Sequence, residues 1–279
     1  MSSGPLIAPE ELRDAEHGGF AVIDATWHLG GARGRDTYDA GHLPDAHFFD
    51  IDAVAEGAGE LPHMMPLPEA FGAAVAPMIG DGAKPVVVYD QSLVRSAARL
   101  WWTFRVMGID EVRVLDGGGA SWQAAGGHLV THAPRPARGV PELAPRGDLV
   151  VGFDDMRELI EKEDVLILDA RSAGRFAGVE PEPRPGLRSG AMPGACSLPF
   201  GDLYNASGRM KPPSELEALI GRFDPGRYRL VVATCGSGIS ACSILLALSR
   251  LDFDQLALYD GSWAEWASRG GPVVGADRP

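Results

Sequence analysis

Short, continuous runs of hydrophobic residues recur along the chain, and several precede a longer stretch with helical spacing. Uninterrupted hydrophobic strands that alternate with helices are typical of a parallel sheet covered by helices on both faces. We therefore predict an α/β fold with strands at Ala21–Asp24, Val86–Tyr89, Arg113–Leu115, Val165–Leu168, Leu230–Ala233 and Gln255–Tyr259. Helices are predicted at Ser96–Met107, Pro213–Phe223 and Ser240–Leu251. In such sheets, ligands bind beyond the carboxyl ends of the strands.

The same series of motifs occurs twice. The hydrophobic run that ends at Asp24 in AVIDATWHL matches the run that ends at Asp169 in VLILDARSAGRF. Next, GHLPDAHFFDID matches SGAMPGACSLPF, and PVVVYDQSLVRSAARLWW matches LVVATCGSGISACSILLA, which places Asp90 opposite Cys235. Finally, VRVLDGGGASWQAAGG matches LALYDGSWAEWASRGG. Four blocks in one order, each separated from its counterpart by about 145 residues, indicate a duplicated domain.

A segment rich in proline and arginine separates the two copies. Residues 132–148, HAPRPARGVPELAPRGD, have few periodic apolar positions, which is typical of a semi-rigid linker. We predict an N-terminal domain over residues 1–131 and a C-terminal domain over residues 149–279. Each domain is long enough to bury its own hydrophobic core.

Composition limits the kinds of molecule that the chain is expected to bind and the cellular compartment in which it is expected to act. A formal net charge of −13 disfavours nucleic acid and anionic membranes, because both bind clustered Lys and Arg. The N-terminus lacks the pattern of a secretory signal, and no apolar run approaches the roughly 20 residues that span a bilayer. The three cysteines, Cys196, Cys235 and Cys242, are too few for a disulfide framework and lack metal-ligand spacing. We expect a cytoplasmic protein that needs no metal or organic cofactor.

Cys235 has the setting of a reactive cysteine. The sequence LVVATCGSGISACSILLALSRL predicts a strand, a tight loop that begins at Cys235, and a helix. Gly236 and Gly238 allow the backbone N–H groups of such a loop to converge at the N-terminus of the helix, which favours the thiolate form of the cysteine. A buried, inert cysteine is the common alternative, and we assign Cys196 and Cys242 to packing because neither has this setting.

The duplicated layout and the loop CGSGIS resemble the rhodanese-like sulfurtransferases over almost the full length of the chain. The resemblance implies two tandem rhodanese-like domains, of which the first is catalytically silent because Asp90 stands at the cysteine position. The loop is similar to that of 3-mercaptopyruvate sulfurtransferases, in which Cys-Gly-Ser-Gly precedes an aliphatic residue and Ser or Thr. Members that prefer thiosulfate usually have basic residues after the cysteine, where this chain has Gly236 and Ser237.

The same resemblance implies the substrate-binding residues. In 3-mercaptopyruvate sulfurtransferases, a Gly-Arg-Phe and a following Glu-Pro-Glu-Pro-Arg supply two guanidinium groups for the substrate's carboxylate and ketone. The matching residues are Arg175 and Arg184, and planar guanidinium groups suit an α-keto acid. The loop residues Gly236, Gly238, Ile239 and Ser240 are expected to complete the substrate site. Arg171 and Arg188 are expected at the rim or in structural ion pairs.

A proton-handling group is also implied by the resemblance. We assign it to Ser237, two residues after the cysteine, to His42 in the motif GHLPDAHFFDID, and to Asp36 as the acidic partner of His42. A histidine before a proline turn is more often structural, so that alternative stays open for His42. The second copy has Ala191 in the equivalent place, where the family usually has a histidine.

The resulting hypothesis is a sulfurtransferase that takes sulfur from 3-mercaptopyruvate as a Cys235 persulfide, releases pyruvate, and passes the sulfur to a thiol acceptor such as thioredoxin or to cyanide. One alternative is a thiosulfate:cyanide sulfurtransferase. Another is a non-catalytic sulfur carrier or anion-binding module. A phosphatase is disfavoured because Ala241 occupies the position of the phosphate-clamping arginine in the Cys-x5-Arg loop of the related phosphatases.

Overall fold

The computed structural model describes residues 4–15, 18–57 and 61–275, and it divides into two compact units. The first unit consists of residues Met1–Glu56, Met65–Arg146 and Asn205–Met210, and the second of Gly57–Met64, Gly147–Tyr204 and Lys211–Pro279. Each half of the sequence therefore contributes one short segment to the unit that the other half builds. Residues 132–146 of the predicted linker belong to the first unit, where Ala144 N donates a 3.0 Å hydrogen bond to Met107 O.

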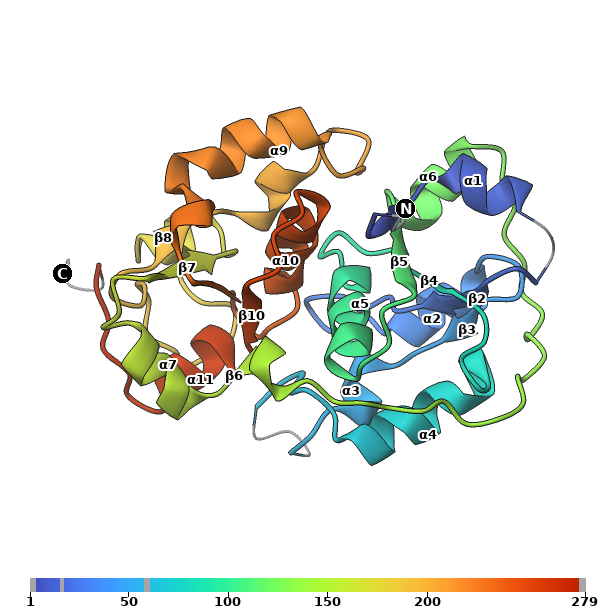
Figure 1. Cartoon of the computed structure of the whole chain (residues 1–279), viewed down its shortest axis with the longest axis horizontal. Helices are drawn as coiled ribbons and strands as arrows, with labels where there is room; N and C mark the ends of the chain where they lie inside the picture. Colours follow the sequence, from blue (N-terminus) through green and yellow to red (C-terminus); the bar gives the residue numbers. More distant parts are fainter. Residues whose placement is uncertain (1–3, 16–17, 58–60, 276–279) are drawn as a thin grey trace. The chain divides into compact units, whose positions relative to one another are not determined.

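Each unit contains one five-stranded sheet in which every pairing is parallel (Figure 1). The first sheet has the spatial order β1 (Leu6–Ile7), β5 (Val112–Leu115), β4 (Val86–Tyr89), β2 (Ala21–Asp24) and β3 (His47–Phe48). The second has the order β6 (Val150–Val151), β10 (Leu256–Tyr259), β9 (Leu230–Thr234), β7 (Val165–Asp169) and β8 (Cys196–Ser197). The two orders correspond strand by strand, which confirms the α/β fold and the duplication.

Helices connect the strands and cover the sheets. The first unit contains α1 (Pro9–Asp14), α2 (Gly34–Ala40), α3 (Ile51–Val54), α4 (Pro68–Ile79), α5 (Ala97–Val106) and α6 (Gly118–Ala124). The second contains α7 (Phe153–Leu159), α8 (Ala173–Phe176), α9 (Pro213–Ile220), α10 (Ala241–Arg250) and α11 (Ser262–Ser268). Helix α5 packs on β4 and β5, and α10 packs on β9 and β10. None of the helices in the described part of the chain has the length and apolar character required to cross a bilayer.

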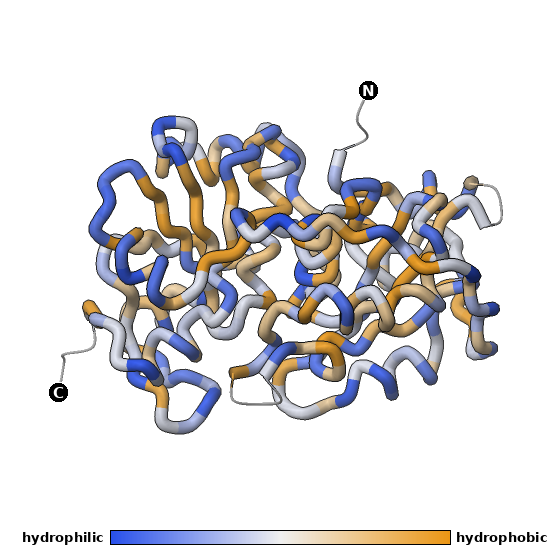
Figure 2. The backbone as a smooth tube through the Cα atoms, turned by 60° about the horizontal axis from the view of Figure 1, so that its bottom comes forward, coloured by the Kyte–Doolittle hydropathy of each residue, from blue (hydrophilic) through white to orange (hydrophobic). Residues whose placement is uncertain are grey.

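The central strands are buried from both sides. All four residues of β2 and of β4 are buried, and so are all five residues of β7. Figure 2 shows hydrophobic and hydrophilic stretches alternating along the backbone. Burial of both faces explains why these strands are continuous hydrophobic runs, and it leaves the loops at the strand ends as the places where chemistry can occur.

Candidate active site

Cys235 lies at the carboxyl end of the central strand of the second sheet. Strand β9 ends at Thr234, and helix α10 begins at Ala241, so residues 235–240 form the intervening loop. Cys235 is buried, with 2% of the residue's surface exposed. Ser237 and Ile239 are also buried, whereas Ser240 is partly exposed. The structure therefore places the predicted loop residues together at the edge of the sheet where parallel α/β folds bind ligands.

The start of α11 holds the backbone of this loop. Trp263 N donates a 2.9 Å hydrogen bond to Cys235 O, and Ala264 N donates a 3.0 Å hydrogen bond to Gly236 O. These two carbonyl groups are thereby directed towards α11. In the described part of the chain, no group accepts a hydrogen bond from the backbone N–H of Gly236, Ser237, Ile239 or Ser240. Several N–H groups at the N-terminus of a helix can bind an anion.

Arg175 reaches the Cys235 loop from helix α8. Ser172 caps this short helix, and its hydroxyl accepts a 3.3 Å hydrogen bond from Arg175 N. The Arg175 guanidinium passes so close to Gly236 that a Cβ on that glycine would lie 2.9 Å from Arg175 Nη2. The side chain of Arg175 remains 19% exposed. Glycine at position 236 therefore allows a cationic group to lie directly against the loop.

A buried carboxylate holds Arg175 in this position. Glu182, only 2% exposed, accepts hydrogen bonds from Arg175 Nη2 and, at 3.2 Å, from Arg175 Nε. The same carboxylate binds Arg171 Nη1 at 2.7 Å. A neighbouring acidic residue, Glu180, accepts a 2.6 Å hydrogen bond from the hydroxyl of Ser172. The Glu-Pro-Glu-Pro-Arg segment thus orients Arg175 as well as supplying Arg184.

Arg171 is a structural residue. Its side chain is fully buried, pairs with Asp169 at 2.7 Å, and lies over the ring of Trp263 with 4.2 Å between the guanidinium carbon and the ring centroid. Burial acts to lower the pKa of Arg171, but the charges of Asp169 and Glu182 outweigh it and raise that pKa. Arg188 instead donates from Nη2 to Gly271 O at 2.8 Å. Both arginines therefore have structural bonds within the second unit.

Arg184 contacts a histidine that the sequence analysis missed. Arg184 Nη2 lies 3.2 Å from Nε2 of His63, which belongs to the segment Gly57–Met64 of the second unit. A guanidinium can only donate, so a hydrogen bond in this contact requires His63 Nε2 as the acceptor. His63 is 5% exposed and has a φ of 62°. The surrounding sequence, GELPHMMP, has no periodic pattern that would have indicated this position.

His42 has the environment of a packed residue. It is 1% exposed, its ring stacks on Tyr38 with 3.9 Å between centroids, and its Nδ1 and Nε2 lie 2.9 and 3.1 Å from the carbonyl oxygens of Tyr38 and His132. Asp36 lies on α2, is largely exposed, and faces Arg33 at 4.0 Å. Within the described residues, no hydrogen bond joins Asp36 to His42, so their pairing stays a prediction without a contact behind it.

The first unit has a carboxylate where the second has the thiol. Asp90 is buried, and its two oxygens accept hydrogen bonds from Ser92 N at 3.2 Å and from Ala97 N at 2.8 Å. Burial raises the pKa of Asp90 to about 6, although these two bonds act in the opposite direction. The Asp90 carboxylate thus accepts hydrogen bonds from two backbone N–H groups that follow β4, at the position where the second unit has a thiol.

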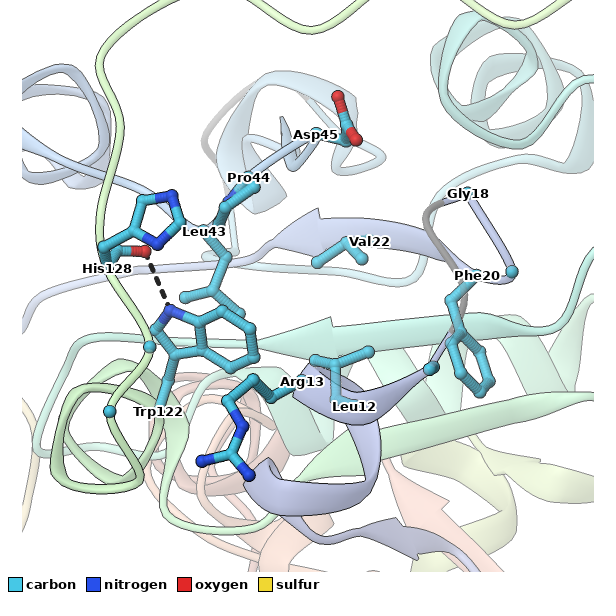
Figure 3. A pocket seen from close by; sticks show the side chains of 14 residues that line it. Leu12, Arg13, Gly18, Phe20, Val22, Leu43, Pro44, Asp45, Trp122 and His128 are labelled. Carbon is cyan, nitrogen blue, oxygen red and sulfur yellow. Dashed lines mark hydrogen bonds between the residues drawn. The ribbon is translucent and has the colours of Figure 1, made fainter.

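A separate pocket of about 280 Å³ lies in the first unit, at the amino end of β2 (Figure 3). Its apolar lining includes Leu12, Phe20 and Leu43, beside Trp122, whose Nε1 donates to His128 O at 2.9 Å. Strands β2 and β4 are parallel, and the Asp90 loop follows the carboxyl end of β4. The pocket, at the amino end of β2, therefore lies at the opposite end of these strands from the Asp90 loop. It contains none of the predicted site residues.

Comparisons with known proteins agree with this architecture. The family profile described as "Rhodanese-like domain" matches residues 9–125 and 153–269. The 3-mercaptopyruvate sulfurtransferase of Escherichia coli (strain K12) is 37% identical over 263 residues, which cover 93% of this chain and 92% of that protein. The thiosulfate sulfurtransferase of Bos taurus is 35% identical over 94% of this chain and 90% of its own length.

A solved structure is similar to this chain over almost the full length of both. The crystal structure of SseA from Escherichia coli superposes with a TM-score of 0.80 at 32% identity, over 94% of this chain and 99% of that one. Family profile, sequence relatives and fold agree over both copies, including the copy that carries Cys235. This chain therefore belongs to the rhodanese-like sulfurtransferase family.

Proposed function

We propose that the chain transfers sulfur from 3-mercaptopyruvate to a thiol or cyanide through a persulfide on Cys235. The observation that carries this proposal is the position of Arg175, whose guanidinium lies against Gly236, the residue after the cysteine. A thiolate at the N-terminus of a helix beside a guanidinium can receive a donor that has both a sulfur atom and a carboxylate. The relatives named 3-mercaptopyruvate sulfurtransferase support this choice of donor.

The first half-reaction forms the persulfide. Arg175 and Arg184 bind the carboxylate and ketone of 3-mercaptopyruvate, and the Cys235 thiolate attacks the donor's sulfur. A sulfur–sulfur bond forms as the carbon–sulfur bond breaks, and the electron pair of that bond leaves with pyruvate as its enolate. Protonation of the enolate carbon then gives pyruvate. The persulfide anion is stabilised by the N–H groups of Gly236, Ser237, Ile239 and Ser240.

The second half-reaction restores the enzyme. A thiolate acceptor such as that of thioredoxin, or cyanide, attacks the outer sulfur, and the electron pair of the sulfur–sulfur bond returns to Cys235. Proton transfer is assigned to Ser237 together with His63 or water. We favour His63 over His42 for this role because His63 contacts Arg184, whereas both ring nitrogens of His42 face backbone carbonyl oxygens.

Exchange of the two arginines for alanine tests the donor. Arg175→Ala and Arg184→Ala should lower kcat/KM for 3-mercaptopyruvate by about 100-fold and that for thiosulfate much less, because thiosulfate has no carboxylate to bind. Arg188→Ala is the matched control, since its Nη2 binds a backbone carbonyl oxygen in the same region. Equal losses with both donors would refute the carboxylate role.

Thiosulfate is a second candidate donor because the bovine relative is a thiosulfate sulfurtransferase. In this case the wild type would turn over thiosulfate with the higher kcat/KM, and the persulfide on Cys235 would still form. A chain that binds anions without turnover of either donor would instead support the non-catalytic alternative. We also propose that the protein acts in the cytoplasm, although one of its relatives is named as mitochondrial, and cell fractionation tests this directly.

A further inference from the structure

Ser262 has an unusual backbone conformation at the start of α11. Its φ is 51°, in the left-handed region that residues with a side chain rarely adopt, and the residue is completely buried. The serine follows Gly261 and precedes Trp263, whose N–H binds the carbonyl of Cys235. Strained conformations of this kind persist where the surrounding structure requires them, and they occur often at functional sites.

The hydroxyl of Ser262 connects the end of β10 to the cysteine. Ser262 Oγ donates a 2.9 Å hydrogen bond to Tyr259 O and accepts a 3.2 Å hydrogen bond from Cys235 N. A hydroxyl has a single proton, so donation to Tyr259 leaves its lone pairs to face the Cys235 N–H. The backbone of Cys235 is thereby held on both sides, through its N–H by Ser262 and through its carbonyl by Trp263.

The silent copy shows that the fold needs the conformation but not the hydroxyl. Gly118 corresponds to Ser262 and has a φ of 60°. Gly119 N donates to Asp90 O at 3.0 Å, just as Trp263 N donates to Cys235 O. A Cβ on Gly118 would lie 2.2 Å from Asp90 O, so this copy cannot accommodate a serine without rearrangement. Only the copy with the nucleophile has a side chain at this strained position.

We propose that Ser262 is a positioning residue for Cys235. The inference rests on the proposed role of Cys235 as the nucleophile. By holding the Cys235 N–H, the Ser262 hydroxyl fixes the direction of the Cys235 side chain relative to the remaining loop N–H groups and to the Arg175 guanidinium. Attack on the donor's sulfur requires alignment of the two sulfur atoms, whereas binding of the donor's carboxylate does not. Loss of the hydroxyl therefore lowers kcat and leaves KM nearly unchanged.

Two substitutions separate this role from a structural one. Ser262→Ala removes the hydroxyl and keeps a side chain in the left-handed conformation, so it should lower the unfolding midpoint in urea. Ser262→Gly removes the same hydroxyl but also relieves the strain, so its midpoint should stay closer to that of the wild type. If Ser262 had only a structural role, activity would follow stability, and Ser262→Gly would be more active than Ser262→Ala. A positioning serine should give the same loss of about 10- to 100-fold in kcat in both variants.

The assay measures kcat and KM with 3-mercaptopyruvate, together with single-turnover formation of the Cys235 persulfide by mass spectrometry. Ser268→Ala is the matched control, because its hydroxyl binds the Glu265 carbonyl on the same helix. A Ser262→Gly variant with wild-type kcat would overturn the inference. A wild type that forms no persulfide with 3-mercaptopyruvate or thiosulfate would instead refute the proposed function itself, so the two failures are distinguishable.

Discussion

Replacement of Asp90 with asparagine removes the carboxyl group that occupies the loop of the first unit. Burial raises the pKa of Asp90 to about 6 from an ordinary value of 3.8. The folded state therefore binds this proton more tightly than the unfolded state does. Between these two pKa values the folded chain carries more protons, so the free energy of unfolding falls as the pH rises through this window. Asparagine cannot titrate, so its contribution to the free energy of unfolding does not depend on pH.

The magnitude follows from the size of the shift. A difference of about 2 pKa units corresponds to about 3 kcal/mol of stability that is present at low pH and lost by about pH 7. Roughly 1 kcal/mol of this change falls between about pH 5 and about pH 7.5, because the rest occurs at lower pH. The stability of Asp90→Asn relative to the wild type should therefore increase by about 1 kcal/mol over that range.

Urea unfolding at about pH 5, 6 and 7.5, followed by far-ultraviolet circular dichroism, measures this difference. Asp39→Asn is the control, since its carboxylate is 53% exposed and pairs with Arg35 on the surface. Both variants should keep sulfurtransferase activity, because neither residue belongs to the proposed active site. A constant difference between the wild type and Asp90→Asn at all three pH values would refute the reasoning that burial dominates the titration of Asp90.

Two further substitutions test the packing around Arg175. Arg171→Leu should destabilise the protein by about 3–5 kcal/mol in urea unfolding, because it leaves the buried carboxylates of Asp169 and Glu182 without their shared cation, and a loss below about 1 kcal/mol would contradict this. Gly236→Ala should raise KM for 3-mercaptopyruvate by about tenfold in steady-state kinetics, because the new Cβ displaces the Arg175 guanidinium. Gly221→Ala, with no atom within 4 Å of the added Cβ, is its control, and equal KM values in the two variants would argue against the contact.

Local patterns identified the sheets because burial of both faces produces a continuous hydrophobic run. Strands β2 and β4 have the predicted bounds, and β7 and β9 each extend one residue further, to Asp169 and Thr234. The two-residue strands β1, β3, β6 and β8 were not predicted, since two residues are too few to show a period. The position of Cys235 was predictable for a related reason, because the run of β9 and the glycines after it are contiguous in sequence.

The histidine beside Arg184 could not be predicted in the same way. His63 lies in an irregular segment, and its place in the second unit depends on packing between residues that are 121 positions apart in sequence. His42 was assigned from the resemblance of its motif, GHLPDAHFFDID, to the family, and a motif does not show that both ring nitrogens face backbone carbonyl oxygens. The role of Glu182 as the anchor of Arg175 also required the structure, because the spacing of charges does not show which of them meet.

The most direct test of the account compares the wild type with Cys235→Ser, using 3-mercaptopyruvate and thiosulfate as donors under the same conditions. Mass spectrometry of the intact chain before addition of an acceptor detects the gain of one sulfur atom, and pyruvate release measures turnover of 3-mercaptopyruvate. We expect the wild type to gain sulfur on Cys235 and to release pyruvate, while Cys235→Ser does neither. Pyruvate release by Cys235→Ser at the wild-type rate would contradict the central claim that this cysteine carries the sulfur.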